Sequence, residues 1–388
     1  MTLAEVAGQS LANGAAGTAL MHVERAWTGC GTWTTAQDHI RRVVAGPVDA
    51  AEHAGLYYGA PAVALLLQAV ADRHPRYRAA SQTMDEHVLR LTRRRLSNAA
   101  ARIDREEPAA FAEYDLFYGL TGIGALLLRH HPDSDELTGI LRYVVTLATR
   151  PRHENGVALP GWWVAHDPDK IMPTPGGHAN FGMAHGAAGL LSFLALAAVH
   201  GRVVDGQREA ISVLTEWFER WRQDGTDGPW WPQWITREEL RAGHPAHTRP
   251  GRSSWCYGTV GIARALQLAA LATDDPQRQH TAEDALAASL TDTQLDRITE
   301  PGLCHGIAGI YQTAYRASLN TCGPSIAHRL PALADRLAQH ARPLGEEDNN
   351  QVDAAGLLTG RAGVELALET ARRGTPPHTG WDACLLIT

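Results

Sequence analysis

The stretch LCHGIAG at residues 303–309 contains the pattern that decides the fold, a glycine pair that opens an apolar segment. The same pattern recurs along the whole chain, and its leading glycines are spaced by 45 residues (Gly14 to Gly59) up to 72 residues (Gly186 to Gly258). Each unit therefore has room for about two helices and a variable loop. The seven copies are NGAAG at 13–17, YGAPA at 58–62, YGLTG at 118–122, HGAAG at 185–189, YGTVG at 257–261, HGIAG at 305–309 and TGRAG at 359–363.

The segments after the glycine pairs are rich in Ala and Leu, and several are apolar on all sides. A helix of this kind belongs inside a large core. Charged amphipathic stretches such as 84–103 and 327–341 alternate with them and are expected as outer helices with one wet face. An inner ring of helices covered by an outer ring buries both layers. The pattern predicts an all-α fold, an α/α toroid made as a double barrel of seven helical hairpins; an open helical solenoid is the alternative.

The length of 388 residues exceeds that of a usual single domain, but repeats along the whole length predict one domain over 1–388. A net charge of -7 does not support nucleic-acid binding as the main task. The arginines at 93–95 are soon followed by acidic residues, so they are interpreted as a solvated helix face.

The chain opens with Met-Thr-Leu-Ala-Glu, which is not a signal peptide, and the longest apolar run, near 187–199, is too short to cross a membrane. Five cysteines without a regular framework indicate a reducing compartment. A cytoplasmic protein is expected. The pattern assigns no role to Cys30, Cys322 or Cys384.

Two segments, near 149–182 and 223–254, interrupt the hairpin pattern and are expected as irregular loop insertions. Long loops of this kind are often lids or binding segments. They are rich in tryptophan, so a second interpretation is that the indole rings pack the loops onto the barrel. The residues concerned are Trp162, Trp163, Trp230, Trp231 and Trp234.

The residue immediately before each leading glycine is polar or a tyrosine, and pseudo-rotation of the hairpins would bring these positions into a ring at one end of the inner barrel. One position further back stand Cys256 and Cys304. The alignment therefore places both cysteines at the same height around one axis as His185 and His305. The ring positions are Asn13, Tyr58, Tyr118, His185, Tyr257, His305 and Thr359.

Cys256, Cys304 and His305 together offer two thiolates and one imidazole, a ligand set that zinc accepts in tetrahedral geometry. Three protein ligands leave a fourth position open, which is typical of a catalytic zinc site. The other cysteines lie outside the motif. The alternative is that the two cysteines are small buried residues, but their shared ring position beside a histidine favours zinc.

The motifs HGAAG (185–189), SSWCYGTVG (253–261) and LCHGIAG (303–309) resemble those of the lanthionine synthetase C-like proteins, and in particular of the stand-alone lanthipeptide cyclases. The resemblance covers the whole chain and implies seven helical hairpins around a central zinc. It implies an enzyme that joins peptide cysteines to dehydroalanine or dehydrobutyrine as thioether rings. It also implies that Cys256, Cys304 and His305 hold the metal. A departure, Ala62 in place of the second glycine of its copy, concerns helix packing.

The resemblance assigns four further active residues: His185, Arg252, Tyr257 and Asp115. The chemistry needs a positive group where an enolate forms, for which Arg252 is the candidate. It also needs an acid that titrates near neutrality, for which His185, oriented by Asp115, is the candidate. Alternatives remain open, since Arg252 is also suited to pair with a carboxylate and Asp115 to cap the helix near Gly119. Tyr257 is also suited to a packing role.

Three functions are weighed. The first is a zinc-dependent lanthipeptide cyclase acting on a dehydrated precursor peptide made by a separate dehydratase. The second is addition of a small thiol such as glutathione to dehydrated proteins. The third is a non-catalytic scaffold that binds peptide and dehydratase, with zinc serving stability.

Overall fold

The computed structural model describes residues 8–169, 171–321, 323–342 and 355–388. Seven inner helices each begin directly after the leading glycine of a motif copy, so the predicted inner ring is confirmed. Six of the leading glycines are extended, whereas Gly59, which precedes the copy with Ala62, has a φ of 72°. The inner helices are α2 (Ala15–Thr28), α4 (Ala60–Ala71), α7 (Leu120–His130), α9 (Ala187–Val199), α12 (Thr259–Thr273), α15 (Ile307–Ser318) and α17 (Arg361–Arg373).

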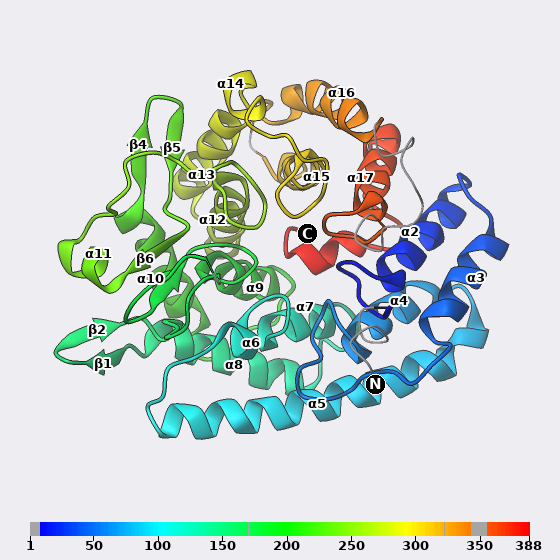
Figure 1. Ribbon diagram of the computed structural model, residues 1–388, viewed down its shortest axis with the longest axis horizontal. Coiled ribbons are helices and arrows are strands. Elements are labelled where there is room, and N and C mark those ends of the chain that lie inside the picture. Colours follow the sequence, from blue (N-terminus) through cyan, green and yellow to red (C-terminus); the bar gives the residue numbers. More distant parts are fainter. Residues whose placement is uncertain (1–7, 170, 322, 343–354) are drawn as a thin grey trace.

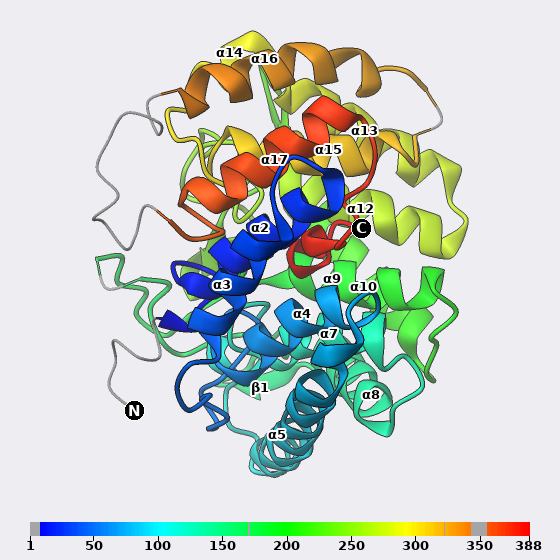
Figure 2. The same ribbon diagram turned by 90° about the vertical axis from the view of Figure 1, so that its right-hand side faces the viewer.

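Outer helices follow six of the inner ones and cover them in a second ring (Figure 1). Both stretches expected as outer helices are helical. The stretch 84–103 lies in α5 (Arg78–Asp104), and the stretch 327–341 comprises a short turn, η2 (Ala327–Arg329), and α16 (Leu330–Ala341). The described chain after α17 turns inward instead, and η5 (Trp381–Leu385) lies within the ring in both views (Figures 1 and 2). The outer helices are α3 (Trp33–Val43), α5 (Arg78–Asp104), α8 (Asp135–Thr149), α10 (Gln207–Trp221), α13 (Pro276–Ser289) and α16 (Leu330–Ala341).

A closed circle of backbone hydrogen bonds joins the seven motif loops just before the inner helices. Each bond runs from the nitrogen of a residue two or three positions before one leading glycine to the carbonyl of the residue two positions before the next. The circle closes between the last copy and the first, which excludes the open solenoid and places Cys256 and Cys304 at one height. The N–O distances are 3.0 Å (Leu11 to Tyr57), 3.4 Å (Tyr57 to Phe117), 3.1 Å (Leu116 to Ala184), 3.3 Å (Ala184 to Cys256), 3.2 Å (Cys256 to Cys304), 2.9 Å (Cys304 to Leu358) and 3.1 Å (Leu358 to Ala12).

The closure supports the prediction of one domain over 1–388, which stays a prediction. Elsewhere in the described ranges lie four shorter helical pieces, η1 (Pro75–Tyr77), α6 (Phe111–Tyr114), α11 (Arg237–Ala242) and α14 (Asp292–Leu295). None of the helices described is both long and apolar enough to cross a membrane.

The second glycine of a copy is required by a close backbone approach. A Cβ added at Gly309 would lie 1.9 Å from the carbonyl oxygen of Leu303. Replacing Gly309 by alanine is expected to lower the free energy of unfolding by about 1–3 kcal/mol, because the turn cannot relieve this overlap without shifting the helix. Denaturant unfolding measures the loss. Gly46→Ala is the control, since no atom lies within 4 Å of the added Cβ; equal stability of both variants would contradict the prediction.

The two insertions are more ordered than expected. They contain β1 (Arg152–Glu154) paired with β2 (Val157–Leu159), and β4 (Gln223–Gly225) paired with β5 (Gly228–Trp230). The expectation of wholly irregular loops is wrong, because three-residue strands are too short to show an alternation in the sequence.

A third pairing joins the two insertions to each other, as β3 (His178–Asn180) runs antiparallel to β6 (Trp234–Thr236) with Ala179 opposite Ile235. The side chains of Trp162, Trp163, Trp230 and Trp231 are buried. Burial supports the interpretation that the tryptophans pack these segments onto the barrel. The β3 strand leads directly into the HGAAG motif.

The arginine cluster is not a uniformly solvated face. Arg93 and Arg94 are exposed, but Arg95 is buried and its Nε donates to the carbonyl of Glu52 at 2.9 Å. Its guanidinium also bonds the carbonyl of Tyr118. Interpreting Arg95 as solvated was wrong, because the loops before α4 and α7 present carbonyls to the outer helix.

Of the remaining cysteines, Cys30 is exposed and Cys384 is buried in the C-terminal segment. Cys322 lies outside the described residues.

Candidate metal centre and active site

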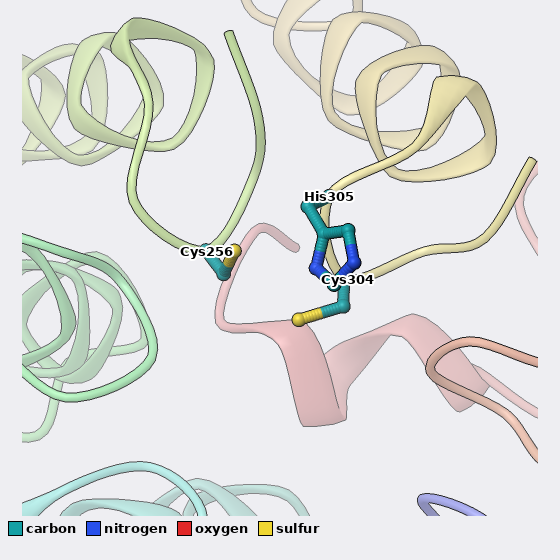
Figure 3. A group of neighbouring side chains, drawn as sticks. All are labelled: Cys256, Cys304 and His305. Carbon is teal, nitrogen blue, oxygen red and sulfur yellow. The ribbon is translucent and has the colours of Figure 1, made fainter. Parts of the chain in front are cut away.

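The three predicted ligands come together at the mouth of the inner barrel. One donor atom from each of Cys256, Cys304 and His305 lies within 4.8 Å of the other two. The two cysteines come from neighbouring loops of the hydrogen-bonded circle, and Figure 3 shows both thiols and the imidazole converging on one point. Two soft sulfur donors and one imidazole fit a divalent ion of the zinc type. These residues are positioned to bind a metal.

The electrostatics of the cluster favour a thiolate. Hydrogen bonds from the Cys304 thiol and from His305 lower the pKa of Cys256 well below its ordinary value. The same hydrogen bond to Cys256, together with burial, raises the pKa of Cys304, and the contact with Cys256 raises the pKa of His305. The lowered pKa suits Cys256 to a ligand role, because the thiolate is the form of cysteine that binds metals. A metal that also bound Cys304 and His305 would release their protons.

Glu300 was not foreseen from the sequence and connects two of the predicted residues. Its carboxylate bonds Nε2 of His305 and accepts a hydrogen bond from Nη1 of Arg252 at 2.8 Å. Nδ1 is therefore the ring nitrogen of His305 left for the cluster. Arg252 and Glu300 each lie six residues before the leading glycine of neighbouring copies, Gly258 and Gly306. Aligning the copies at that offset would have placed Glu300 beside Arg252.

Glu300→Gln is expected to weaken metal binding about 10- to 100-fold, the usual effect of losing a carboxylate that orients a histidine ligand. The measurement is a competition titration against a chromophoric chelator. Glu219→Gln serves as control, because Glu219 forms a comparably exposed ion pair with Arg278 on the outer ring. Unchanged affinity in the Glu300 variant would show that His305 is held without the carboxylate.

Asp115 and His185 form the second part of the site. His185 Nδ1 lies 2.6 Å from Oδ2 of Asp115, whose side chain is fully buried. The other carboxylate oxygen accepts hydrogen bonds from the backbone nitrogens of Tyr118 (2.7 Å) and Gly119 (2.8 Å). Asp115 therefore binds the backbone just before α7 and lies against the histidine, whereas the helix itself begins after Gly119 without a side-chain cap.

The repeat explains why Asp115 is unusual. It lies four residues before its leading glycine, a position that is Ser10, Gly55, Gly182, Ser254, Gly302 and Gly356 in the other copies. A side chain is excluded at Gly55 and Gly302, since a Cβ there would lie 2.5 or 2.8 Å from a carbonyl oxygen of the next copy. A carboxylate in this position reaches the neighbouring loop, where it meets His185.

Aromatic rings fix the plane of the His185 imidazole. The centroids of Phe111 and Phe117 lie 5.0 and 4.9 Å from it, both nearly parallel. The centroid of the Tyr257 ring lies 6.0 Å from that of the imidazole, and Tyr257 directly follows Cys256 in the chain. Burial, with the charge near Cys256, raises the pKa of Tyr257, so its hydroxyl stays protonated at neutral pH. With Nδ1 bound to Asp115, the half-buried imidazole has Nε2 left to face a substrate.

The sequence model of the family described as "Lanthionine synthetase C-like protein" matches residues 5–386. The chain belongs to the lanthionine synthetase C-like family. The resemblance carried by the WCYG and CHG motifs is thereby confirmed, and with it the expectation of an enzyme of the lanthionine synthetase class.

Nisin biosynthesis protein NisC of Lactococcus lactis subsp. lactis is 23% identical over 340 residues, which cover 86% of this chain and 77% of that protein. A solved structure of nisin cyclase matches with a TM-score of 0.83 at 20% identity, covering 98% of this chain and 93% of that one. This likeness confirms the toroid fold.

Proposed function

We propose that this member of the lanthionine synthetase C-like family is a zinc-dependent lanthipeptide cyclase, which adds peptide cysteine thiols to dehydroalanine or dehydrobutyrine. The observation that carries the proposal is the placement of the Cys256–Cys304–His305 cluster and the Asp115–His185 pair at one end of one barrel. A thiol-activating site beside an oriented proton donor suits the addition of a thiol across a carbon–carbon double bond.

Cys256, Cys304 and His305 would hold the zinc ion. When bound, zinc favours the ionised form of a thiol that coordinates it. Glu300 holds His305 in the orientation that keeps Nδ1 directed at the cluster.

The other residues act on the substrate as it reacts. The new C–S bond forms at the β-carbon, and the π electrons of the double bond move to the α-carbon and its amide as an enolate. The guanidinium of Arg252 stabilises this charge. Nε2 of His185 delivers the proton to the α-carbon, while Asp115 stabilises the ring and fixes its tautomer. The protonated hydroxyl of Tyr257, whose ring lies beside His185, is a further hydrogen-bond donor for the substrate.

The proposed substrate is a precursor peptide, leader plus core, in which serine or threonine has already lost water. A separate dehydratase must supply it, since thiol addition needs the double bond beforehand. We place this reaction in the cytoplasm, in keeping with the cysteine usage.

A synthetic peptide with one cysteine and one dehydroalanine tests the proposal. Incubation with the zinc-loaded protein should remove the thiol that a maleimide labels, without change of peptide mass. In a parallel reaction that contains glutathione, an increase in peptide mass by one glutathione would instead favour the small-thiol alternative. If the protein binds the peptide but the peptide keeps both its thiol and its double bond, the non-catalytic scaffold is favoured.

A further inference from the structure

Residues 378–388 occupy the centre of the toroid. The segment runs inside the ring of inner helices in both views (Figures 1 and 2). Trp381, Leu385, Leu386 and Ile387 are each at most 1% exposed. The interior that a ring of helices leaves open is thus filled by the end of the chain.

Charged side chains of the inner helices bind the backbone of this segment. Glu24 of α2 accepts hydrogen bonds from the nitrogens of His378 and Thr379, both at 2.8 Å. Arg264 of α12 donates from Nε and Nη2 to the carbonyl of Ile387 at 3.0 and 2.9 Å. Buried charges are costly unless they are paired. Both charged groups therefore find hydrogen-bond partners in the backbone of the C-terminal segment.

Two further helices contribute in the same way. Arg129 of α7 donates to the carbonyls of Thr379 and Gly380 at 2.8 and 2.9 Å. Asp382, which is fully buried, accepts from Gln312 at 2.6 Å and from Arg316. The segment is thereby fixed against four inner helices.

Two hydrogen bonds extend from the segment to the active site. The indole Nε1 of Trp255 donates to the carbonyl of Leu385 at 3.0 Å, and Trp255 directly precedes the ligand Cys256. The hydroxyl of Tyr57 donates to the carbonyl of Cys384 at 2.8 Å. Tyr57 stacks on Phe117 at 4.6 Å, and Phe117 in turn stacks on His185.

We infer that the C-terminal segment is a positioning element for both halves of the active site, acting through Trp255 on the metal-ligand loop and through Tyr57 and Phe117 on His185. The inference rests on the proposed function. Trp255 and Tyr57 touch no reacting atom in this arrangement. They join the loops of two motif copies to the buried backbone of the C-terminal segment.

The test removes each hydrogen-bond donor. In Trp255→Phe, the affinity for zinc, measured by chelator competition, should fall about tenfold or more. In Tyr57→Phe, which keeps the aromatic ring, the affinity for zinc should stay unchanged and kcat at saturating zinc should fall below that of the parent. Trp221→Phe is the control, because Trp221 is equally buried and its Nε1 has no hydrogen-bond partner in the described part of the chain.

Zinc affinity within twofold of the parent in Trp255→Phe and an unchanged kcat in Tyr57→Phe, with only the unfolding temperature lowered, would overturn the inference and leave the segment a purely structural core. An equal loss of affinity in Trp221→Phe would overturn it too. If the parent protein itself bound no zinc, the proposed function and this inference would both fail. If the parent protein binds zinc and the two variants behave like the parent, only this inference fails.

Discussion

Cys304→Ala is expected to lose the metal and almost all cyclisation activity. The cluster has three protein ligands, so removing one leaves a two-ligand site of far lower affinity. Without the metal, the cysteine of the substrate peptide is only a few per cent ionised at neutral pH. It is also no longer held in position for attack, which lowers the rate further. We expect the rate to fall at least about 10²-fold, and the metal content from about one zinc per chain to nearly none.

Elemental analysis after purification without chelators, followed by the maleimide assay, measures both effects. Cys30→Ala is the matched control, because Cys30 is an exposed free cysteine away from the cluster. A folded parent protein without zinc, or a Cys304 variant that retains both zinc and turnover, would exclude the proposed ligand set.

His185→Ala is expected to keep the metal and lose turnover by about 10²- to 10⁴-fold, the usual contribution of a general acid. The reason is geometric, since His185 is oriented through Nδ1 by Asp115 and is not a member of the cluster. Asp115→Asn should lower kcat less, because the amide still accepts one hydrogen bond but no longer stabilises the charged ring.

Single-turnover kinetics with the dehydrated peptide, at saturating zinc, measures this effect. His280→Ala, on the exposed face of α13, is the control. If His185→Ala lost zinc in proportion to turnover, the histidine would belong to the metal site and not to proton transfer. Full activity in the variant would favour the scaffold alternative.

Much of the fold was accessible from the sequence because the motif repeats. The leading glycines mark the starts of all seven inner helices, and the apolar segments after them give the buried ring. The phase of the repeat also brought Cys256, Cys304 and His305 together although 47 residues separate the first two, Cys256 to Cys304. A residue's place in such a fold depends on its offset within a copy, which the sequence states directly.

Other parts of the site depend on contacts that no offset within one copy specifies. Interpreting Arg95 as solvated was wrong because its partners, the carbonyls of Glu52 and Tyr118, belong to two other loops. The pairing of β3 with β6 joins the two insertions, and strands of three residues carry no recognisable period. Glu300 was missed for a different reason. It lies at the same offset before its leading glycine as Arg252, but the two residues have opposite charges, so the copies show no common residue type at that offset.

The sequence by itself determined the seven inner helices and the grouping of Cys256, Cys304 and His305, because these follow from a local pattern repeated at one phase. Only the tertiary structure decided that the ring closes and what fills it. Glu24, Arg129 and Arg264 lie in largely apolar helices, and the sequence does not reveal that the backbone of the C-terminal segment supplies hydrogen-bond partners for them. The physical reason is that a buried charge requires a partner close in space, and the folded ring brings the C-terminal segment against its inner helices.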